Sequence, residues 1–135
     1  ASTIKHSVFM FSEEERKAFS AAMDAALDDR LKMMRKRQSY FKEIAKGYES
    51  FEEFVKAQEE KFEILGIELY EEESYISLRI QLDYNDYETY HIVMGDNGHL
   101  TVSDIIWWQD LYCANSVMNI QTGKSADEED IPKCF

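Results

Sequence analysis

The sequence has few of the residues that usually cross-link or interrupt a small protein. It contains one proline, five glycines and two cysteines among 135 residues. Two cysteines cannot form a disulfide framework, so we expect a hydrophobic core to hold the fold and the thiols to stay reduced. With Pro132 as the only proline, the ends of helices and strands must be predicted from glycines, capping residues and changes of hydrophobic period.

Long apolar runs are also missing. No segment approaches the roughly 18 consecutive apolar residues of a membrane span. The N-terminal residues ASTIKHSVFMF lack the charged start, apolar stretch and cleavage site of a signal peptide. We therefore expect a soluble, cytoplasmic protein that does not contact a membrane.

The motifs of common enzymes and metal sites do not occur. The sequence has no HExxH, paired CxxC, GxSxG or P-loop pattern. Among the histidines, His91 and His99 flank a predicted turn, but a two-residue hairpin loop would place them on opposite faces of the sheet. We expect no cofactor, no metal and no catalysis, and keep a small enzyme using His91 or His99 as a second alternative.

The composition indicates a single folded domain. Hydrophobic residues make up 44% of the chain and aromatic residues 13%, which is enough for a core. We predict one α+β domain over residues 1–120. Residues 121–135 contain the acidic run 127–130 and are predicted to be a loose tail.

Two helices are predicted in the first half of the chain. Ser12 with Glu15 and Ser50 with Glu53 form capping boxes, and an apolar stripe follows each. The first helix is long and is expected to continue to about residue 46, with a break near residues 38–39 as the alternative. Gly66 ends the second helix, and the short connection over residues 47–50 makes the two helices an antiparallel pair.

A change of period then predicts an antiparallel meander of three or four strands. Residues 74–82 and 87–94 alternate between apolar and polar positions, and residues 95–98 form a hairpin turn. Residues 67–71 and 99–102 are predicted to be short strands. Residues 103–120 are apolar in nearly every helical direction, which favours a C-terminal helix packed on the sheet.

Charge is distributed unevenly along the chain. The net charge is −12, but residues 30–46 hold seven bases and one acid, a local charge of +6 that leaves −18 elsewhere. This stretch suggests an alternative function, a nucleic-acid-binding regulator that uses Arg35, Lys36, Arg37 and Lys42. The bases could instead neutralise acids elsewhere in the chain, especially Glu52, Glu59, Glu60 and Glu63 of the second helix.

The acidic surface supports the leading hypothesis. Carboxylates spaced along a rigid scaffold can imitate the phosphates of a nucleic acid and steer a basic protein toward it. We therefore expect a non-enzymatic protein that inhibits or regulates a basic partner, without itself binding nucleic acid. Anti-defence inhibitors of phages or plasmids and immunity or antitoxin proteins have this size and charge. The expected contact residues are Glu52, Glu59, Glu60, Glu63, Glu71, Glu72, Glu73 and Asp96.

Aromatic residues near the C-terminus suggest a further contact. Adjacent helical residues point about 100° apart. In a helix packed on the sheet, Trp107 and Trp108 therefore cannot both face the hydrophobic core. If Trp107 enters the core, Trp108 and Tyr112 form a neighbouring stripe that could bind a partner or join two copies of the chain. Coverage of this stripe by the N-terminal segment is equally compatible with the sequence.

Overall fold

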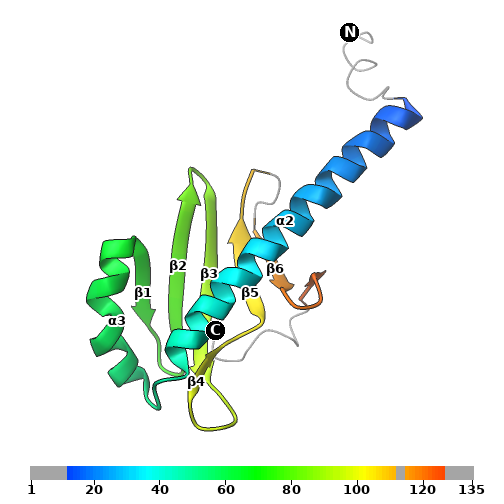
Figure 1. The fold of residues 1–135 in the computed structure, drawn as a ribbon. Coiled ribbons are helices and arrows are strands. Elements are labelled where there is room, and N and C mark those ends of the chain that lie inside the picture. The colour runs from blue at the N-terminus through cyan, green and yellow to red at the C-terminus, as the bar shows by residue number, and fades with distance from the viewer. Residues whose placement is uncertain (1–11, 112–114, 127–135) are drawn as a thin grey trace. The chain divides into compact units, whose positions relative to one another are not determined.

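The computed structural model describes residues 12–111 and 115–126. These residues belong to two compact units that divide within the first helix, one ending at Met33 and the other beginning at Met34. The elements are drawn in Figure 1. The second unit contains α2 from Met34 onward, α3 and the sheet.

Two helices open the described chain. Helix α2 spans Glu13–Ala45 and α3 spans Phe51–Leu65. The capping box of α2 is formed: the Ser12 hydroxyl accepts the Glu15 amide at 3.1 Å, and the Glu15 carboxylate accepts the Ser12 amide at 3.3 Å. The Ser50 hydroxyl accepts the Glu53 amide, and Gly66 ends α3 in the left-handed region at φ 76°. The predicted helix ends are thus confirmed, and α2 continues past residues 38–39 without a break.

The remaining elements form one seven-stranded sheet in which every pairing is antiparallel. Its order is β1-β2-β3-β5-β6-β7, and β4 pairs with the end of β3 that β5 leaves uncovered. The strands are β1 Ile67–Glu71, β2 Ile76–Asp83, β3 Asp86–Met94, β4 Leu100–Val102, β5 Ile105–Gln109, β6 Ser116–Asn119 and β7 Lys124–Ser125. Strand β1 therefore lies at one edge.

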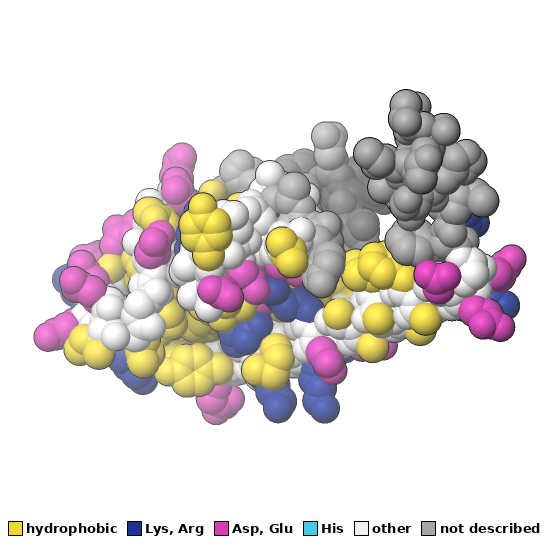
Figure 2. Space-filling model, turned by 90° about the horizontal axis from the view of Figure 1, so that it is seen from above, with side chains coloured by type: hydrophobic (Ala, Val, Ile, Leu, Met, Phe, Trp, Pro, Cys, Tyr) yellow, Lys and Arg dark blue, Asp and Glu magenta, His cyan; other side chains and the backbone are white. Residues whose placement is uncertain are grey.

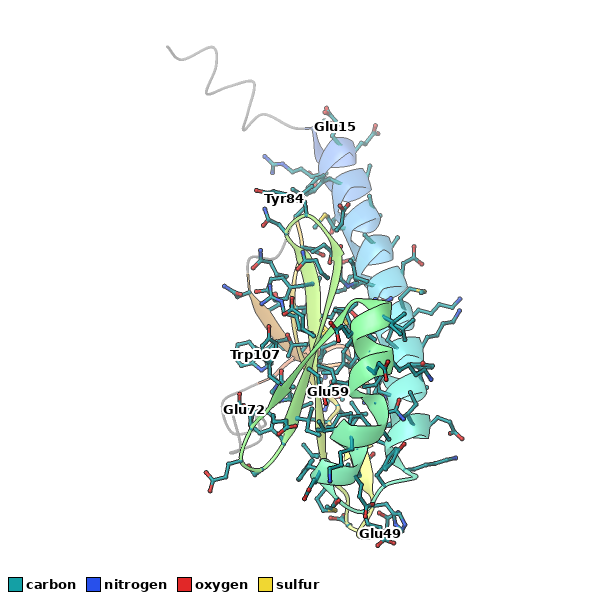
Figure 3. All side chains as sticks on the ribbon, turned by 90° about the vertical axis from the view of Figure 1, so that its left-hand side faces the viewer. Glu15, Glu49, Glu59, Glu72, Tyr84 and Trp107 are labelled. Carbon is teal, nitrogen blue, oxygen red and sulfur yellow. The ribbon has the colours of Figure 1, made fainter. Side chains whose placement is uncertain are left out.

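The core of the second unit lies between the helices and one face of the sheet (Figure 3). Phe41 of α2 contacts Phe62 of α3 and Tyr90 of β3, with ring centroids 6.0 and 5.3 Å apart. Phe54 of α3 completes this aromatic cluster through Phe62. All four rings are almost completely buried, so edge-to-face and tilted packing of large side chains holds α2 and α3 on the sheet.

The predicted C-terminal helix is wrong for the described residues. Residues 105–109 form the inner strand β5, and residues 116–119 form β6. The run Ile105-Ile106-Trp107-Trp108 consists of β-branched and aromatic residues, which favour strands. A strand buried on both faces is apolar at successive positions, so the pattern that suggested a surrounded helix also fits an inner strand.

The sheet also extends beyond the predicted end of the domain. Ile120 is buried, and residues 124–125 pair with β6 within the segment predicted to be a loose tail. Residues 127–135, which include the acidic run, lie outside the described residues. Within the part of the chain that the structure describes, no helix has the length and apolar character to cross a membrane.

Candidate protein-binding surface

Three glutamates of α3 form a line along the helix. Glu52, Glu59 and Glu63 are separated by seven and four residues, which returns each side chain to nearly the same direction. All three are exposed, whereas Phe54, Val55 and Phe62 face the core. The same periodicity that buries one side of α3 therefore presents a row of carboxylates on another.

A hollow of ≈ 490 Å³ lies where this row meets the end of β1. Glu52 and Glu59 of α3 line it together with Glu71 and Glu72, which come from β1 and the turn after it. Its apolar lining residues are Phe51, Val55 and Ile76. Lys56 is the one base among the described lining residues, and its ammonium group lies 3.2 Å from Glu52.

A second hollow of ≈ 520 Å³ lies further along the same pair of elements. Glu59 lines both hollows, and Glu63 and Glu68 add two more carboxylates to the second. The remaining lining residues are Gly66, Ile67, Leu69 and Tyr70. The Tyr70 hydroxyl donates a hydrogen bond to the Glu68 carboxylate, which raises the pKa of Tyr70.

We call the carboxylates around these two hollows the α3–β1 acidic surface. Figure 2 shows acidic side chains gathered over this end of the molecule. In Figure 3, Glu59 lies on α3 beside the sheet edge and Glu72 lies in the turn after β1. The members of the surface are Glu52, Glu59, Glu63, Glu68, Glu71 and Glu72.

The structure brings together most, but not all, of the acids expected to bind a partner. Glu60 and Glu73 are exposed but line neither hollow. Asp96 lies in the β3–β4 turn, at the same end of the sheet as Glu72 because Ile76 pairs with Ile92, yet it also lines neither hollow. Glu68 was not among the expected contacts. Its position in a predicted strand directly after an acidic helix is the sequence signal that could have identified Glu68 as part of this surface.

The basic side chains in the second half of α2 lie in a different environment. The Arg37 guanidinium forms two parallel hydrogen bonds of 2.6 Å to the carboxylate of Glu88, a β3 residue that is 0% exposed. The Tyr90 hydroxyl donates to the same carboxylate at 2.7 Å. Burial alone would lower the pKa of Arg37, but the hydrogen bonds and charge of Glu88 raise it above its ordinary value. Burial and the Glu88 carboxylate raise the pKa of Tyr90, which keeps its proton for donation.

Two more of the four candidate nucleic-acid-binding residues also contact the sheet. Arg35 donates to the carbonyl groups of Ile120 and Gln121 at 2.7 and 3.2 Å, and Lys42 lies 3.6 Å from Asp104. Lys36 is exposed. Arg37 and Lys42 do pair with acids elsewhere in the chain, but these acids are Glu88 and Asp104 of the sheet region and not the expected acids of α3.

A buried amide strengthens the same attachment of α2. Gln38 is 1% exposed and donates to the Ser103 carbonyl at 3.2 Å and to the Asp104 carboxylate at 2.7 Å. Its own carbonyl accepts the Gln121 side chain at 2.8 Å. Arg35, Arg37, Gln38 and Lys42 therefore form a polar layer that ties α2 to three parts of the sheet region: Glu88, residues 103–104 and residues 120–121.

The aromatic candidates do not form the expected exposed stripe. Trp108 is 4% exposed, because adjacent residues of β5 face opposite sides of the sheet and Trp108 faces the helices. Trp107 is partly exposed on the other side (Figure 3). Tyr112 lies outside the described residues. A surface site or dimer seam on a C-terminal helix, with Trp108 as its anchor, does not fit this structure.

The two histidines of the enzyme alternative are not brought together. Met94 pairs with Leu100, so residues 95–99 lie between them and the connection is not the two-residue loop on which the expected placement depended. His91 is 3% exposed and its ring lies 4.6 Å from that of Tyr75, whereas His99 lies 3.4 Å from Glu49. Burial lowers the pKa of His91 to about 4. Among the described residues, no three His, Cys, Asp or Glu side chains form a group that could hold a metal ion.

Comparison with known proteins gives no further identification: no family model, no curated protein and no solved structure matches the chain. The candidate surface is therefore defined by its own geometry, a row of carboxylates on α3 facing the acidic edge strand β1.

Proposed function

We propose that this protein binds a partner protein with a basic surface through the α3–β1 acidic surface and thereby inhibits or regulates it. One observation carries the proposal: six carboxylates from a helix, a strand and a turn surround two adjoining hollows. Lys56 is the one base among the described residues that line these hollows. Elements held by a common core fix the spacing of these charges. A fixed array of like charges is complementary to an opposite array on another protein.

The apolar lining gives the surface more than charge. Phe51, Val55 and Ile76 line the first hollow, and Ile67 and Leu69 line the second. Lysine and arginine side chains carry long apolar stems that can cover such residues while their charged ends meet carboxylates. The partner we propose is therefore rich in these two residues, as the nucleic-acid-binding groove of an enzyme or regulator would be.

The net charge of −12 strengthens this preference. It favours rapid encounter with a basic protein at low salt, and it repels free nucleic acid. Binding by Arg35, Lys36, Arg37 and Lys42 to nucleic acid has less support, because Arg37 already contacts Glu88 with both ends of its guanidinium. An anti-defence inhibitor, an immunity protein or an antitoxin is the class of protein that fits best.

The test compares two variants with the same net charge. Glu59→Gln, Glu63→Gln and Glu68→Gln remove three charges around the second hollow, and Asp24→Asn, Asp28→Asn and Asp29→Asn remove three exposed charges of α2. Each tagged protein is used at low salt to capture its partner from the lysate of its source organism. The association rate of the captured protein is then measured at two salt concentrations.

We expect the first variant to lose the partner or to associate with it at least about tenfold more slowly, because steering by charge acts on the association rate. The second variant should behave like the unaltered protein. Equal capture by both variants, or an association rate that salt does not change, would contradict the proposal.

A further inference from the structure

Strand β1 lies at an edge of the sheet. It pairs with β2 over its whole length, from Ile67 opposite Ile80 to Glu71 opposite Ile76, and no described strand pairs with its other side. Figure 3 looks onto this edge. The outward N–H and C=O groups of such a strand are a template for pairing with another extended segment.

The second hollow opens along this edge. Leu69 is paired with the buried Leu78, so Ile67 and Leu69 face the helices, whereas Glu68 and Tyr70 face the opposite side. Residues from both faces of β1 line the same hollow of ≈ 520 Å³. Because four consecutive residues of β1 line it, the hollow follows the strand along the edge at which a further strand would pair, about 4.8 Å away.

The charges around this edge distinguish between possible occupants. A second copy of β1, with the sequence IELYE, would add two more carboxylates, Glu68 and Glu71, to an edge that is already acidic. Charged residues on an edge strand are a common protection against such self-pairing. A segment with lysine or arginine would instead be attracted, since Glu59 and Glu63 lie on the α3 side of the hollow and Glu68 on the other.

We propose that a lysine- or arginine-rich segment of the partner binds in extended form as an additional strand beside β1. Its backbone hydrogen-bonds to the free edge. Its side chains alternate between Glu59 and Glu63 on one face and Glu68 on the other. This mode of binding rests on the proposed function and specifies how the α3–β1 acidic surface recognises its partner.

The probe is a short fluorescent peptide in which lysine and arginine alternate, so that an extended peptide presents basic side chains to both faces. Two matched peptides carry N-methyl groups on alternate backbone amides, one on the odd positions and the other on the even positions. Methylation leaves the charge of each peptide unchanged and removes the hydrogen-bond donors of one edge. Binding to the full chain is measured at low salt by fluorescence anisotropy, and hydrogen exchange of the β1 amides is measured with and without the parent peptide.

We expect the parent peptide to bind and to slow exchange at residues 67–71. One methylated peptide should bind about tenfold more weakly or worse, because its hydrogen bonds to β1 are lost, while the other should bind like the parent. Equal binding by all three peptides, or equal loss by both methylated ones, would overturn strand addition.

Failure of strand addition can be separated from failure of the proposed function. If the three peptides bind equally but Glu59→Gln, Glu63→Gln and Glu68→Gln together abolish their binding, charge recognition stands and strand addition is wrong. If the parent peptide does not bind at low salt, strand addition is overturned, and the capture experiment decides the proposed function independently.

Discussion

In the second half of α2, Arg35, Arg37 and Lys42 are bound to the sheet region, whereas in α3 and β1 the side chains of Glu59, Glu63 and Glu68 lie exposed around a hollow. Both regions are rich in charge of one sign, and both belong to the same compact unit. These bases therefore attach α2 to the sheet region, whereas the acids remain exposed, and we propose that they bind a partner. Figure 2 shows the corresponding surface, with bases along α2 and acids over α3 and β1.

From this contrast we expect the largest effect on stability at the buried ion pair between Arg37 and Glu88. Replacing Arg37 with Met leaves the fully buried Glu88 carboxylate without its guanidinium. We expect a loss of about 3 kcal/mol in the free energy of unfolding, the lower end for breaking a buried pair because Arg37 remains 21% exposed. Urea unfolding measures it.

The control is Lys46→Met, which breaks the exposed ion pair with Glu43. Both of those side chains are more than half exposed, so the loss should stay below about 0.5 kcal/mol. The double variant Arg37→Met with Glu88→Met should recover part of the stability, since it removes both charges. Similar losses for Arg37→Met and Lys46→Met would show that the basic region is not part of the fold.

The next effect is expected at the buried amide. Gln38→Leu removes three hydrogen bonds and leaves the Ser103 carbonyl and Asp104 carboxylate with fewer partners. We expect a loss of about 1–3 kcal/mol in the free energy of unfolding. Lys36→Leu, at the neighbouring exposed position, is the control and should change it by no more than about 0.5 kcal/mol.

A pH-dependent effect is predicted at His91. Its pKa is about 4 in the folded protein and about 6.5 when unfolded, so the unfolded chain binds the proton more readily. The stabilising contribution of the neutral ring is complete above pH 6.5 and is lost as the pH falls from there toward 4. Thermal unfolding between pH 7 and 5 should show the decline, and His91→Phe should reduce it while keeping the stacking on Tyr75. His99→Gln is the surface control, and an unchanged slope in His91→Phe would contradict this assignment.

The smallest effect on stability is expected in the acidic region. Glu59→Gln, Glu63→Gln and Glu68→Gln alter exposed groups that the core does not use. The free energy of unfolding should therefore change by no more than about 0.5 kcal/mol, although we expect the same variant to lose the proposed partner. A loss above about 1 kcal/mol in thermal or urea unfolding would give the acids a structural role and remove the contrast with α2.

Some of the candidate site could be predicted from the sequence. The direction of Glu52, Glu59 and Glu63 follows from helical periodicity once Ser50 and Gly66 define α3. Their approach to Glu68 and Glu71 does not follow, because it depends on how α3 packs on an edge strand. The role of Arg37 has a signal in its spacing, three residues after Met34 and four before Phe41, which places it on the buried side of α2.

Local sequence determined the two helices, their capping residues and the strands from residue 67 to residue 102, since each depends on neighbours within a few positions. The composition determined the overall excess of acid. The tertiary structure decided two things that local pattern leaves open. It made residues 105–109 an inner strand, because an apolar run can be buried as a helix or as a strand until its partners are known. It also bound the bases of α2 to buried and half-buried groups and left the acids of α3 and β1 in solvent. A charged side chain can be buried only where it has a partner, and the partners of Arg35, Arg37 and Lys42 lie more than fifty residues away along the chain.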